Sequence, residues 1–261
     1  MKKLLVLFSL LPTIAFSNET ILVQGAMDME VDYMISQLQN ANKEHIGSWT
    51  FWKGKMGDNN VIISRTEIGL TNSAAATTLG IEKYQPTLII NQGTSGGHDP
   101  SLHQGDIVLG EKIVNFGAFR TEHKDPNIAP AMQDQLFFDV VQRLRNEDNQ
   151  QEKYTHFSSD PKMLNKAIHI PYNHGKVIKG TIGTADQWNR EIERINFIHK
   201  QFGTSSEEME TSAAAQVATA YHIPFIGIRI LSNSEIHSEE FNPDTAQWVQ
   251  SFVVDFIKAL K

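Results

Sequence analysis

Three short, mainly apolar segments constrain the fold of this chain more than any other feature of its sequence. They span residues 21–23, 87–90 and 224–231, and they lack the alternation of apolar and polar side chains found in a half-exposed strand. Strands without that alternation are buried on both faces, and they belong mainly to parallel sheets covered by helices. The sequence therefore predicts an α/β domain around a largely parallel sheet.

The segments between these strands carry further periodic patterns. Val31, Met34, Ile35 and Leu38 recur at helical spacing, so a helix should follow the first strand. Two strands flanking Gly-Asp-Asn-Asn at residues 57–60 have the pattern of a hairpin. In chain order we expect further helices at 73–78, 135–144, 208–221 and 245–260, and strands at 49–56, 61–64, 106–109, 112–115 and 177–182.

The first seventeen residues have the composition of an export signal. Lys2 and Lys3 precede an apolar run at residues 4–16, and Ala15 and Ser17 supply small residues at signal-peptidase spacing. The run is short for a permanent membrane helix, and we expect no membrane span. We expect residues 1–17 to be a signal peptide, residues 18–261 to form the folded domain, and the protein to be exported to a bacterial periplasm. A buried first strand and a retained anchor are the alternatives.

Composition and missing motifs exclude several classes of protein. The chain has no cysteine, which excludes a disulfide scaffold, a thiolate zinc site and a cysteine nucleophile. Its formal net charge of -7 argues against nucleic acid as a partner. The ten histidines are scattered without a ligand motif, and neither G-x-G-x-x-G after the first strand nor G-x-S-x-G is present. We therefore expect no metal and no cofactor, and we interpret His98 and His103 as loop or surface residues.

Three polar clusters lie at the ends of predicted strands, where ligands of α/β sheets usually bind, and a fourth begins a helix just before the last of these strands. Each alone has an ordinary structural interpretation: Asp28 and Glu207 could complement a helix dipole, and Arg229 could form a structural ion pair. We expect the glycine-rich segment 93–97 to form a tight loop. The clusters are residues 25–30 (Gly-Ala-Met-Asp-Met-Glu), 91–97 (Asn-Gln-Gly-Thr-Ser-Gly-Gly), 208–211 (Glu-Met-Glu-Thr, beginning a helix) and 229–233 (Arg-Ile-Leu-Ser-Asn).

In this combination and order, the four clusters resemble the 5'-methylthioadenosine/S-adenosylhomocysteine nucleosidases of the nucleoside phosphorylase superfamily. Val31 and residues 105–108 extend the resemblance, which covers nearly all of residues 18–261. It implies a single three-layer α/β/α domain with a twisted mixed, largely parallel sheet, assembled as a homodimer. It also implies an enzyme that hydrolyses the N-glycosidic bond of a small-molecule purine nucleoside without a cofactor.

The resemblance assigns the chemistry chiefly to two acidic residues. Cleavage of the bond develops positive charge on ribose, and a nearby carboxylate can activate water and stabilise that charge. Glu30 matches the residue with this role, and Glu210 matches the carboxylate that binds the ribose hydroxyls. Glu208 lies in the same motif, Met209 would cover the sugar, Thr94 would hold the water, and Arg229 would order the acids. Trp188, otherwise a core residue, would stack on the base beside Asn189, and Met27, Ile68 and Phe241 would surround the 5' substituent.

Asn233 departs from the family pattern. The family usually has aspartic acid here, which protonates the leaving purine, whereas asparagine supplies only a hydrogen bond. The enzyme could therefore act slowly on adenosine-type substrates, prefer 6-oxopurines, or bind nucleosides with little turnover. Asp186 is a candidate substitute acid.

The acceptor of the sugar is the second open question. Phosphate would require cations around it, and the arginine-bearing phosphate motifs of the phosphorylases are not evident; Arg65 is a candidate cation but is better interpreted as a surface residue. We favour water, with phosphorolysis as the alternative.

Overall fold

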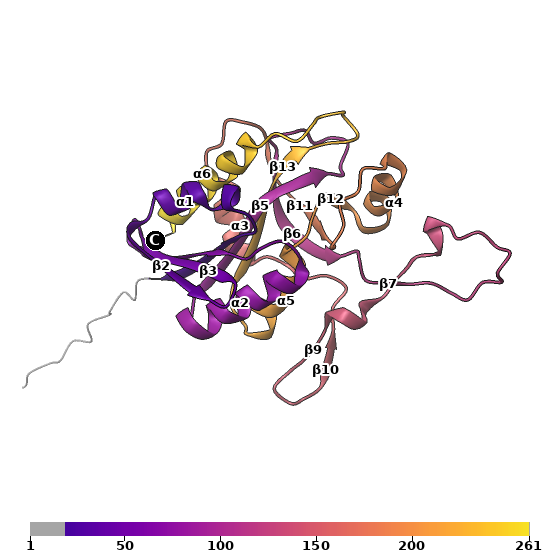
Figure 1. Ribbon diagram of the computed structural model, residues 1–261, viewed down its shortest axis with the longest axis horizontal. Coiled ribbons are helices and arrows are strands. Elements are labelled where there is room, and N and C mark those ends of the chain that lie inside the picture. The colour runs from indigo at the N-terminus through magenta and orange to yellow at the C-terminus, as the bar shows by residue number, and fades with distance from the viewer. Residues whose placement is uncertain (1–18, 261) are drawn as a thin grey trace, which may run out of the picture.

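The structure is a computed structural model that describes residues 19–260, so the predicted signal peptide lies outside the described residues. A nine-stranded sheet with the order β12-β11-β6-β13-β5-β1-β4-β3-β2 forms its centre (Figure 1). The strands are β1 (Thr20–Gly25), β2 (Gln39–Ile46), β3 (Trp49–Met56), β4 (Asn59–Arg65), β5 (Leu88–Gly97), β6 (Ile107–Asn115), β11 (Val177–Thr184), β12 (Thr204–Glu208) and β13 (Phe225–Asn233).

The sheet is mixed, and its central strands are parallel. β1 runs parallel to β4 and β5, β13 parallel to β5, and β11 parallel to β6 and β12. The β2-β3-β4 meander and the β13–β6 pair are antiparallel. β12 also pairs antiparallel with β5, which curls this part of the sheet back on itself. The predicted α/β class with a mixed, largely parallel sheet is confirmed.

Helices cover both faces of the sheet and form the outer layers (Figure 1). Ile21 and Val23 pack with residues of α1 and α6, whereas Leu22 between them packs with α2 and α5 on the opposite face. The uninterrupted apolar sequence of β1 thus serves two cores. The helices are η1 (Asp28–Glu30), α1 (Asp32–Ser36), α2 (Leu70–Tyr84), α3 (Pro161–Ala167), α4 (Ile192–Phe202), α5 (Thr211–Ala220) and α6 (Asp244–Ala259).

A long excursion between β6 and α3 projects from the body (Figure 1). It contains β7 (Phe119–Arg120), η2 (Met132–Asp134), β8 (Leu136–Phe137), η3 (Asp139–Gln142), β9 (Arg143–Arg145) and β10 (Gln151–Lys153). The helix predicted at residues 135–144 is wrong. Phe138, Val140 and Val141 are exposed here, so the apolar pattern finds no continuous core to pack against.

Other elements also differ from the prediction. Residues 93–97 are not a tight loop: they continue β5, because β13 and β12 pair with them. The two strands predicted within residues 106–115 are the single strand β6. The helix predicted from Glu208 begins at Thr211, since Glu208 ends β12. β2, β12, α3 and α4 were not predicted, and β2 and β12 have too little apolar sequence to stand out.

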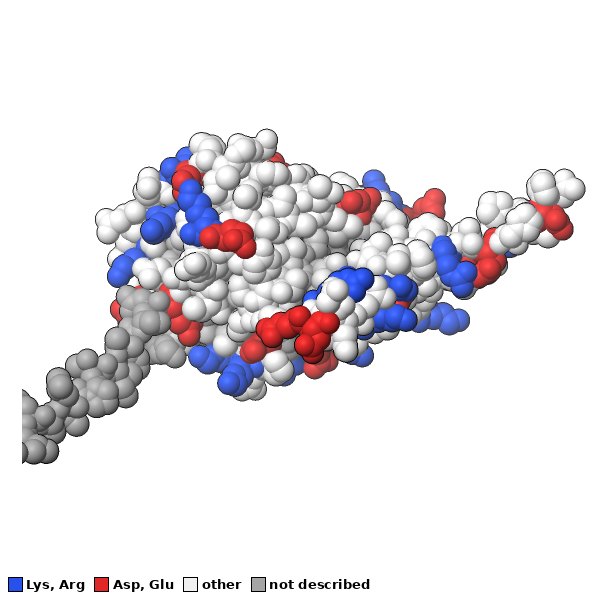
Figure 2. All heavy atoms as spheres, turned by 90° about the horizontal axis from the view of Figure 1, so that it is seen from below, with Lys and Arg blue, Asp and Glu red and all other residues white. Residues whose placement is uncertain are grey.

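The surface of the described residues carries both signs of charge. Figure 2 shows Lys and Arg side chains interspersed with Asp and Glu around a broad uncharged area. Within residues 19–260, no helix combines the length and apolar character needed to cross a membrane.

Candidate active site

A cavity of about 360 Å³ opens at the carboxyl ends of β5 and β13, and β12 and η1 contribute to its walls. This volume suits a small organic ligand. Distant segments meet here because parallel strands end at one edge of the sheet. The lining residues are Ala26, Met27, Met29, Glu30, Ile68, Thr94, Ser95, Gly96, Gln187, Trp188, Glu207, Glu208, Met209, Glu210, Ser232, Asn233 and Phe241.

Glu30, the last residue of η1, is held in the cavity wall by four donors. Its Oε2 accepts hydrogen bonds from the backbone N–H groups of Ala26 (2.9 Å) and Met27 (3.3 Å). Its Oε1 accepts from the backbone N–H and the hydroxyl of Thr94, each at 2.8 Å. The residue is 2% exposed, so its carboxylate is fixed at the cavity and sheltered from bulk water.

Gly93 lets two charged groups approach β5 closely. A Cβ atom on Gly93 would lie 2.7 Å from Glu30 Oε1 and 2.3 Å from Arg229 Nη1. Any larger residue would displace one of these side chains. The glycine therefore serves close packing within a strand, which explains why a glycine-rich segment here is extended.

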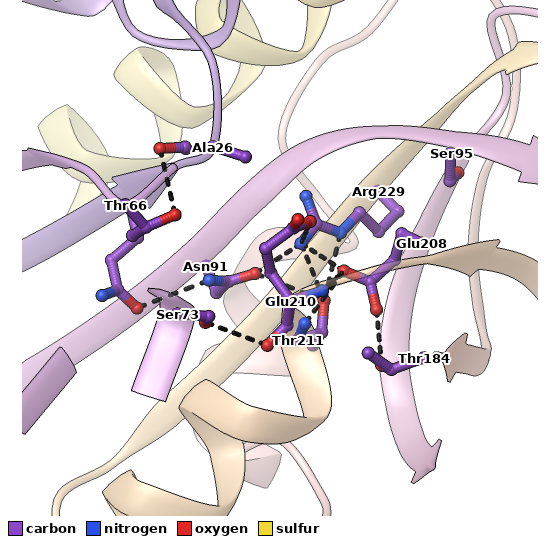
Figure 3. Close-up of polar contacts among 12 residues, drawn as sticks. Ala26, Thr66, Ser73, Asn91, Ser95, Thr184, Glu208, Glu210, Thr211 and Arg229 are labelled. Carbon is purple, nitrogen blue, oxygen red and sulfur yellow. Dashed lines mark hydrogen bonds and ion pairs between the residues drawn. The ribbon is translucent and has the colours of Figure 1, made fainter. Parts of the chain in front are cut away.

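Arg229 lies behind the cavity wall and is 1% exposed (Figure 3). Its Nη2 donates to Glu208 Oε2 and to Asn91 Oδ1, each at 2.5 Å, and to the hydroxyl of Thr211 at 2.9 Å. It is not among the residues that line the cavity. Arg229 therefore positions the acids rather than contacting a ligand.

Glu208 is occupied by the protein itself. Besides Arg229, its Oε2 accepts from the backbone N–H groups of Glu210 and Thr211, each at 2.9 Å. Its Oε1 accepts from the hydroxyl of Thr184 at 2.5 Å (Figure 3). The carboxylate thus anchors the start of α5 and neutralises the arginine.

Glu210 keeps one oxygen available toward the cavity. Its Oε1 accepts from the backbone N–H of Gly69 at 2.9 Å, while its Oε2 lies 3.6 Å from Arg229 Nη2. Burial, and then the negative charge of Glu208, raise the pKa of Glu210 above its usual range, although Arg229 opposes this shift. The negative charge of Glu30 also raises this pKa.

Asn233 ends β13, and its side-chain amide lines the cavity. Its Oδ1 accepts from the hydroxyl of Ser232 at 3.0 Å, so its Nδ2 is the group that remains for a ligand.

Large apolar side chains rim the cavity. Ile68 is 48% exposed, Phe241 42% and Trp188 68%, although all three line the cavity. The interpretation of Trp188 as a core residue is wrong. Met27 and Met209 are half-buried in the same wall. The rim offers apolar contact to a ligand at the mouth.

Comparison with known proteins identifies the family of this chain. Residues 20–260 match the profile of the phosphorylase superfamily. A relative from Bacillus licheniformis, named 5'-methylthioadenosine/S-adenosylhomocysteine nucleosidase, is 31% identical over 92% of this chain and 99% of its own length. This chain belongs to that nucleosidase family within the phosphorylase superfamily.

Solved structures agree with this family fold. The nucleosidase of Neisseria meningitidis, in complex with methylthio-immucillin-A, has a TM-score of 0.76 at 23% identity over 93% of this chain and 100% of its own. The futalosine hydrolase of Helicobacter pylori has a TM-score of 0.75 at 19% identity over 93% of this chain and 98% of its own. The expected enzyme class, N-glycosyl hydrolase, is confirmed at the level of the family.

Four sequence interpretations need correction in this nucleosidase-family chain. Asn189 does not line the cavity; its backbone and side-chain nitrogens donate to Glu207 at 2.7 and 2.6 Å. Glu207 and His98 are not surface or helix-end groups but are 5% and 1% exposed. Asp186, considered as a substitute acid, accepts from the backbone N–H of Leu70 at the start of α2 and does not line the cavity.

Several lining residues of this family member escaped the sequence analysis. Gly96 lies in the glycine-rich segment, two residues after Thr94, and strand alternation would have placed both on one face. Glu207 gave no usable signal, because an acid before a predicted helix is ordinary. The other missed residues are Ala26, Met29, Ser95, Gln187 and Ser232. Among the described residues, no three His, Asp or Glu side chains are grouped as metal ligands.

Proposed function

We propose that this protein hydrolyses the N-glycosidic bond of purine nucleosides with water as the acceptor. The carrying observation is that Glu30 and Glu210, far apart in the sequence, line one cavity. One acid is fixed by four donors, and the other keeps an oxygen available. Such a pair suits a reaction that develops positive charge on a sugar.

The sugar end of the cavity, formed by Glu30, Thr94 and Glu210, would carry the chemistry. Glu210 Oε2 would accept hydrogen bonds from the ribose hydroxyls. A water molecule that replaces the Thr94 hydroxyl as donor to Glu30 Oε1 would lose its proton to the carboxylate as it attacks the anomeric carbon. The same negative charge would stabilise the cationic sugar of the transition state.

Water is favoured over phosphate by the charge of the cavity. None of the described residues that line it is Lys, Arg or His. Arg65, the candidate cation outside it, pairs with Asp28 and Glu67. A phosphate dianion beside Glu30 would therefore lack a neutralising partner, because Arg229 is already held by Glu208.

The base end, formed by Glu207, Asn233 and Trp188, would receive the purine. Trp188 would stack on the base, and the apolar rim with Met27, Ile68 and Phe241 would take a 5'-alkylthio group, as the names of the relatives imply. Asn233 Nδ2 would donate to the purine without protonating it. Both adenine-type and 6-oxopurine nucleosides are therefore test substrates.

Chromatographic product analysis on a panel of purine nucleosides, with and without phosphate, tests the function. The panel contains 5'-methylthioadenosine, S-adenosylhomocysteine, adenosine and inosine. We expect free base and free sugar, at a rate independent of phosphate. Release of ribose 1-phosphate only when phosphate is added would identify a phosphorylase. Tight binding with no base released over hours would identify a nucleoside-binding protein.

Export and assembly complete the proposal. Residues 1–17 would direct the protein to the periplasm, where it would scavenge nucleosides, and amino-terminal sequencing of periplasmic protein should begin near Asn18. A homodimer would cover the apolar side chains exposed at the rim and on the excursion, including Ile68 and Phe138. Light scattering should then give twice the chain mass.

A further inference from the structure

Glu207 is a carboxylate of the cavity wall that the hydrolytic mechanism does not use. It belongs to β12, and its partner in the sheet is Gly96 of β5. On the other side of β5, Gly96 pairs with Asn233 of β13. Glu207 and Asn233 thus flank one glycine from neighbouring strands.

The position of Gly96 places these two side chains beyond the sugar end. Gly96 follows Thr94 by two residues, so both face the same side of β5 about 7 Å apart. A Cβ atom on Gly96 would lie 3.6 Å from Glu207 Cγ and 3.7 Å from Asn233 Nδ2. Because Gly96 has no side chain, the space above its backbone, between Glu207 and Asn233, is open to a flat ring.

The carboxylate of Glu207 is held in this position by residues that lie outside the cavity. Asn189 donates its backbone N–H to Oε1 at 2.7 Å and its amide to Oε2 at 2.6 Å. His98 Nε2 lies 3.1 Å from Oε2, and His98 Nδ1 lies 2.8 Å from the hydroxyl of Thr204. Asn189, His98 and Thr204 are not cavity residues, so three groups outside the cavity hold a 5% exposed carboxylate at its wall.

This arrangement defines the hydrogen-bonding character of the base end. Because both oxygens of Glu207 accept from Asn189, the carboxylate acts as an acceptor, and it retains lone pairs for one further donor. His98 Nε2 is buried behind Glu207 and makes no well-aligned hydrogen bond among the described residues, although it lies 3.1 Å from Glu207 Oε2. Asn233 Nδ2 supplies the neighbouring donor.

We propose that Glu207 is a specificity-determining residue that accepts a hydrogen bond from an N–H on the six-membered ring of the purine. This inference rests on the proposed function. The donor is N1–H in a 6-oxopurine and the exocyclic N–H in a 6-aminopurine, with Asn233 donating to the adjacent acceptor of the base. Purines without a donor at this edge lose the contact and leave the carboxylate unpaired.

Purine riboside, which has no N–H on its six-membered ring, tests this assignment. We compare kcat/KM for inosine, adenosine and purine riboside in the wild type, in Glu207→Gln and in Glu193→Gln, an exposed control on α4. Glutamine places an N–H against the donors of Asn189. We expect Glu207→Gln to lower kcat/KM about 10–100-fold on the better of inosine and adenosine, and to leave purine riboside at the control value.

The outcomes separate a recognition role from a structural one. A loss confined to inosine or to adenosine supports the assignment and identifies the donor as N1–H or the exocyclic N–H. An equal loss on all three nucleosides, or no loss, overturns it. Activity of the wild type on none of them contradicts the proposed function instead.

A binding measurement on the wild type needs no variant, should Glu207→Gln fail to fold. Calorimetry with hypoxanthine, adenine and unsubstituted purine should show at least one of the first two bases binding about tenfold or more tightly than purine. Equal affinity for all three bases would overturn the inference.

Discussion

The buried carboxylates at the two ends of the cavity are stabilised by different kinds of partner. At the sugar end, Arg229 neutralises Glu208, and Glu210 is left with a raised pKa and an available oxygen. At the base end, Glu207 has no arginine or lysine partner among residues 19–260 and is held by Asn189 and His98. The sugar end contains Glu30 and Glu210, which the resemblance matches to the acids of the nucleosidases, whereas Asn233 at the base end departs from that pattern. On the proposed function, the sugar end would carry the reaction and the base end would select the base.

The largest effect should come from removing the charge of the sugar end. Glu30→Gln keeps the size of the side chain but loses the base for water, so kcat should fall about 10²–10⁴-fold. Steady-state kinetics on the best nucleoside measures this. Asp28→Asn, an exposed acid in the same turn, is the control and should retain activity. Equal activity in the wild type and Glu30→Gln would break the assignment.

The next effect concerns the stability of the sugar end. Arg229→Met leaves Glu208 buried without its cation, and the free energy of unfolding should fall by about 3–5 kcal/mol. Denaturant unfolding measures this. The double variant Arg229→Met/Glu208→Gln, which removes the unpaired charge, should recover part of the loss. A single variant as stable as the wild type would show that the ion pair is not needed.

At the base end, the Asn233→Asp variant tests whether this residue limits the release of adenine. The introduced acid can protonate a leaving adenine, so release of adenine should rise about 10²-fold or more. Inosine should gain less, because an oxygen at position 6 needs a donor from this residue. Product analysis with adenosine and inosine measures both rates. An unchanged rate of adenine release would mean that the wild-type site does not lack an acid at this position.

The smallest expected effect is a pH dependence of stability at Glu210. Its pKa is raised in the folded state, so the fold binds this proton more tightly than the unfolded chain does. The stability that protonated Glu210 contributes is fully present below the ordinary pKa of glutamate. It is lost as the pH rises toward and through the raised pKa of the folded state. The Glu210→Gln variant has no such titration. The difference between its melting temperature and that of the wild type should therefore shift in favour of the variant as the pH rises. A difference that does not vary with pH would contradict the shift.

The sequence predicted those parts of the fold whose burial leaves a periodic mark. β1, β5 and β13 are apolar because both faces are covered, and α6 has one apolar side. β12 has the sequence Thr-Ser-Ser-Glu-Glu, and its two acids are paired with His98 and Arg229, which come from the end of β5 and from β13. No local pattern reveals such a strand.

The same limit applies to the site. Glu30, Thr94 and Glu210 could be located because they lie in motifs that resemble a known family. Glu207 was not predicted as a site residue, since its proposed role depends on contacts with Gly96 of β5 and Asn189 of the β11–α4 loop, which are distant in the sequence. Residues 135–144 have a helical apolar pattern, but they do not form the predicted helix, because the excursion has no core against which their apolar side chains could pack.

The most direct test of the account asks whether Glu30 and Glu210 act on one sugar. We would measure kcat and KM for a ribonucleoside and its 2'-deoxy and 3'-deoxy analogues in the wild type, Glu30→Gln and Glu210→Gln. The account predicts that Glu210→Gln abolishes the preference for the ribonucleoside, while Glu30→Gln lowers kcat and keeps that preference. A Glu210→Gln variant that still prefers the ribonucleoside as strongly as the wild type would contradict it.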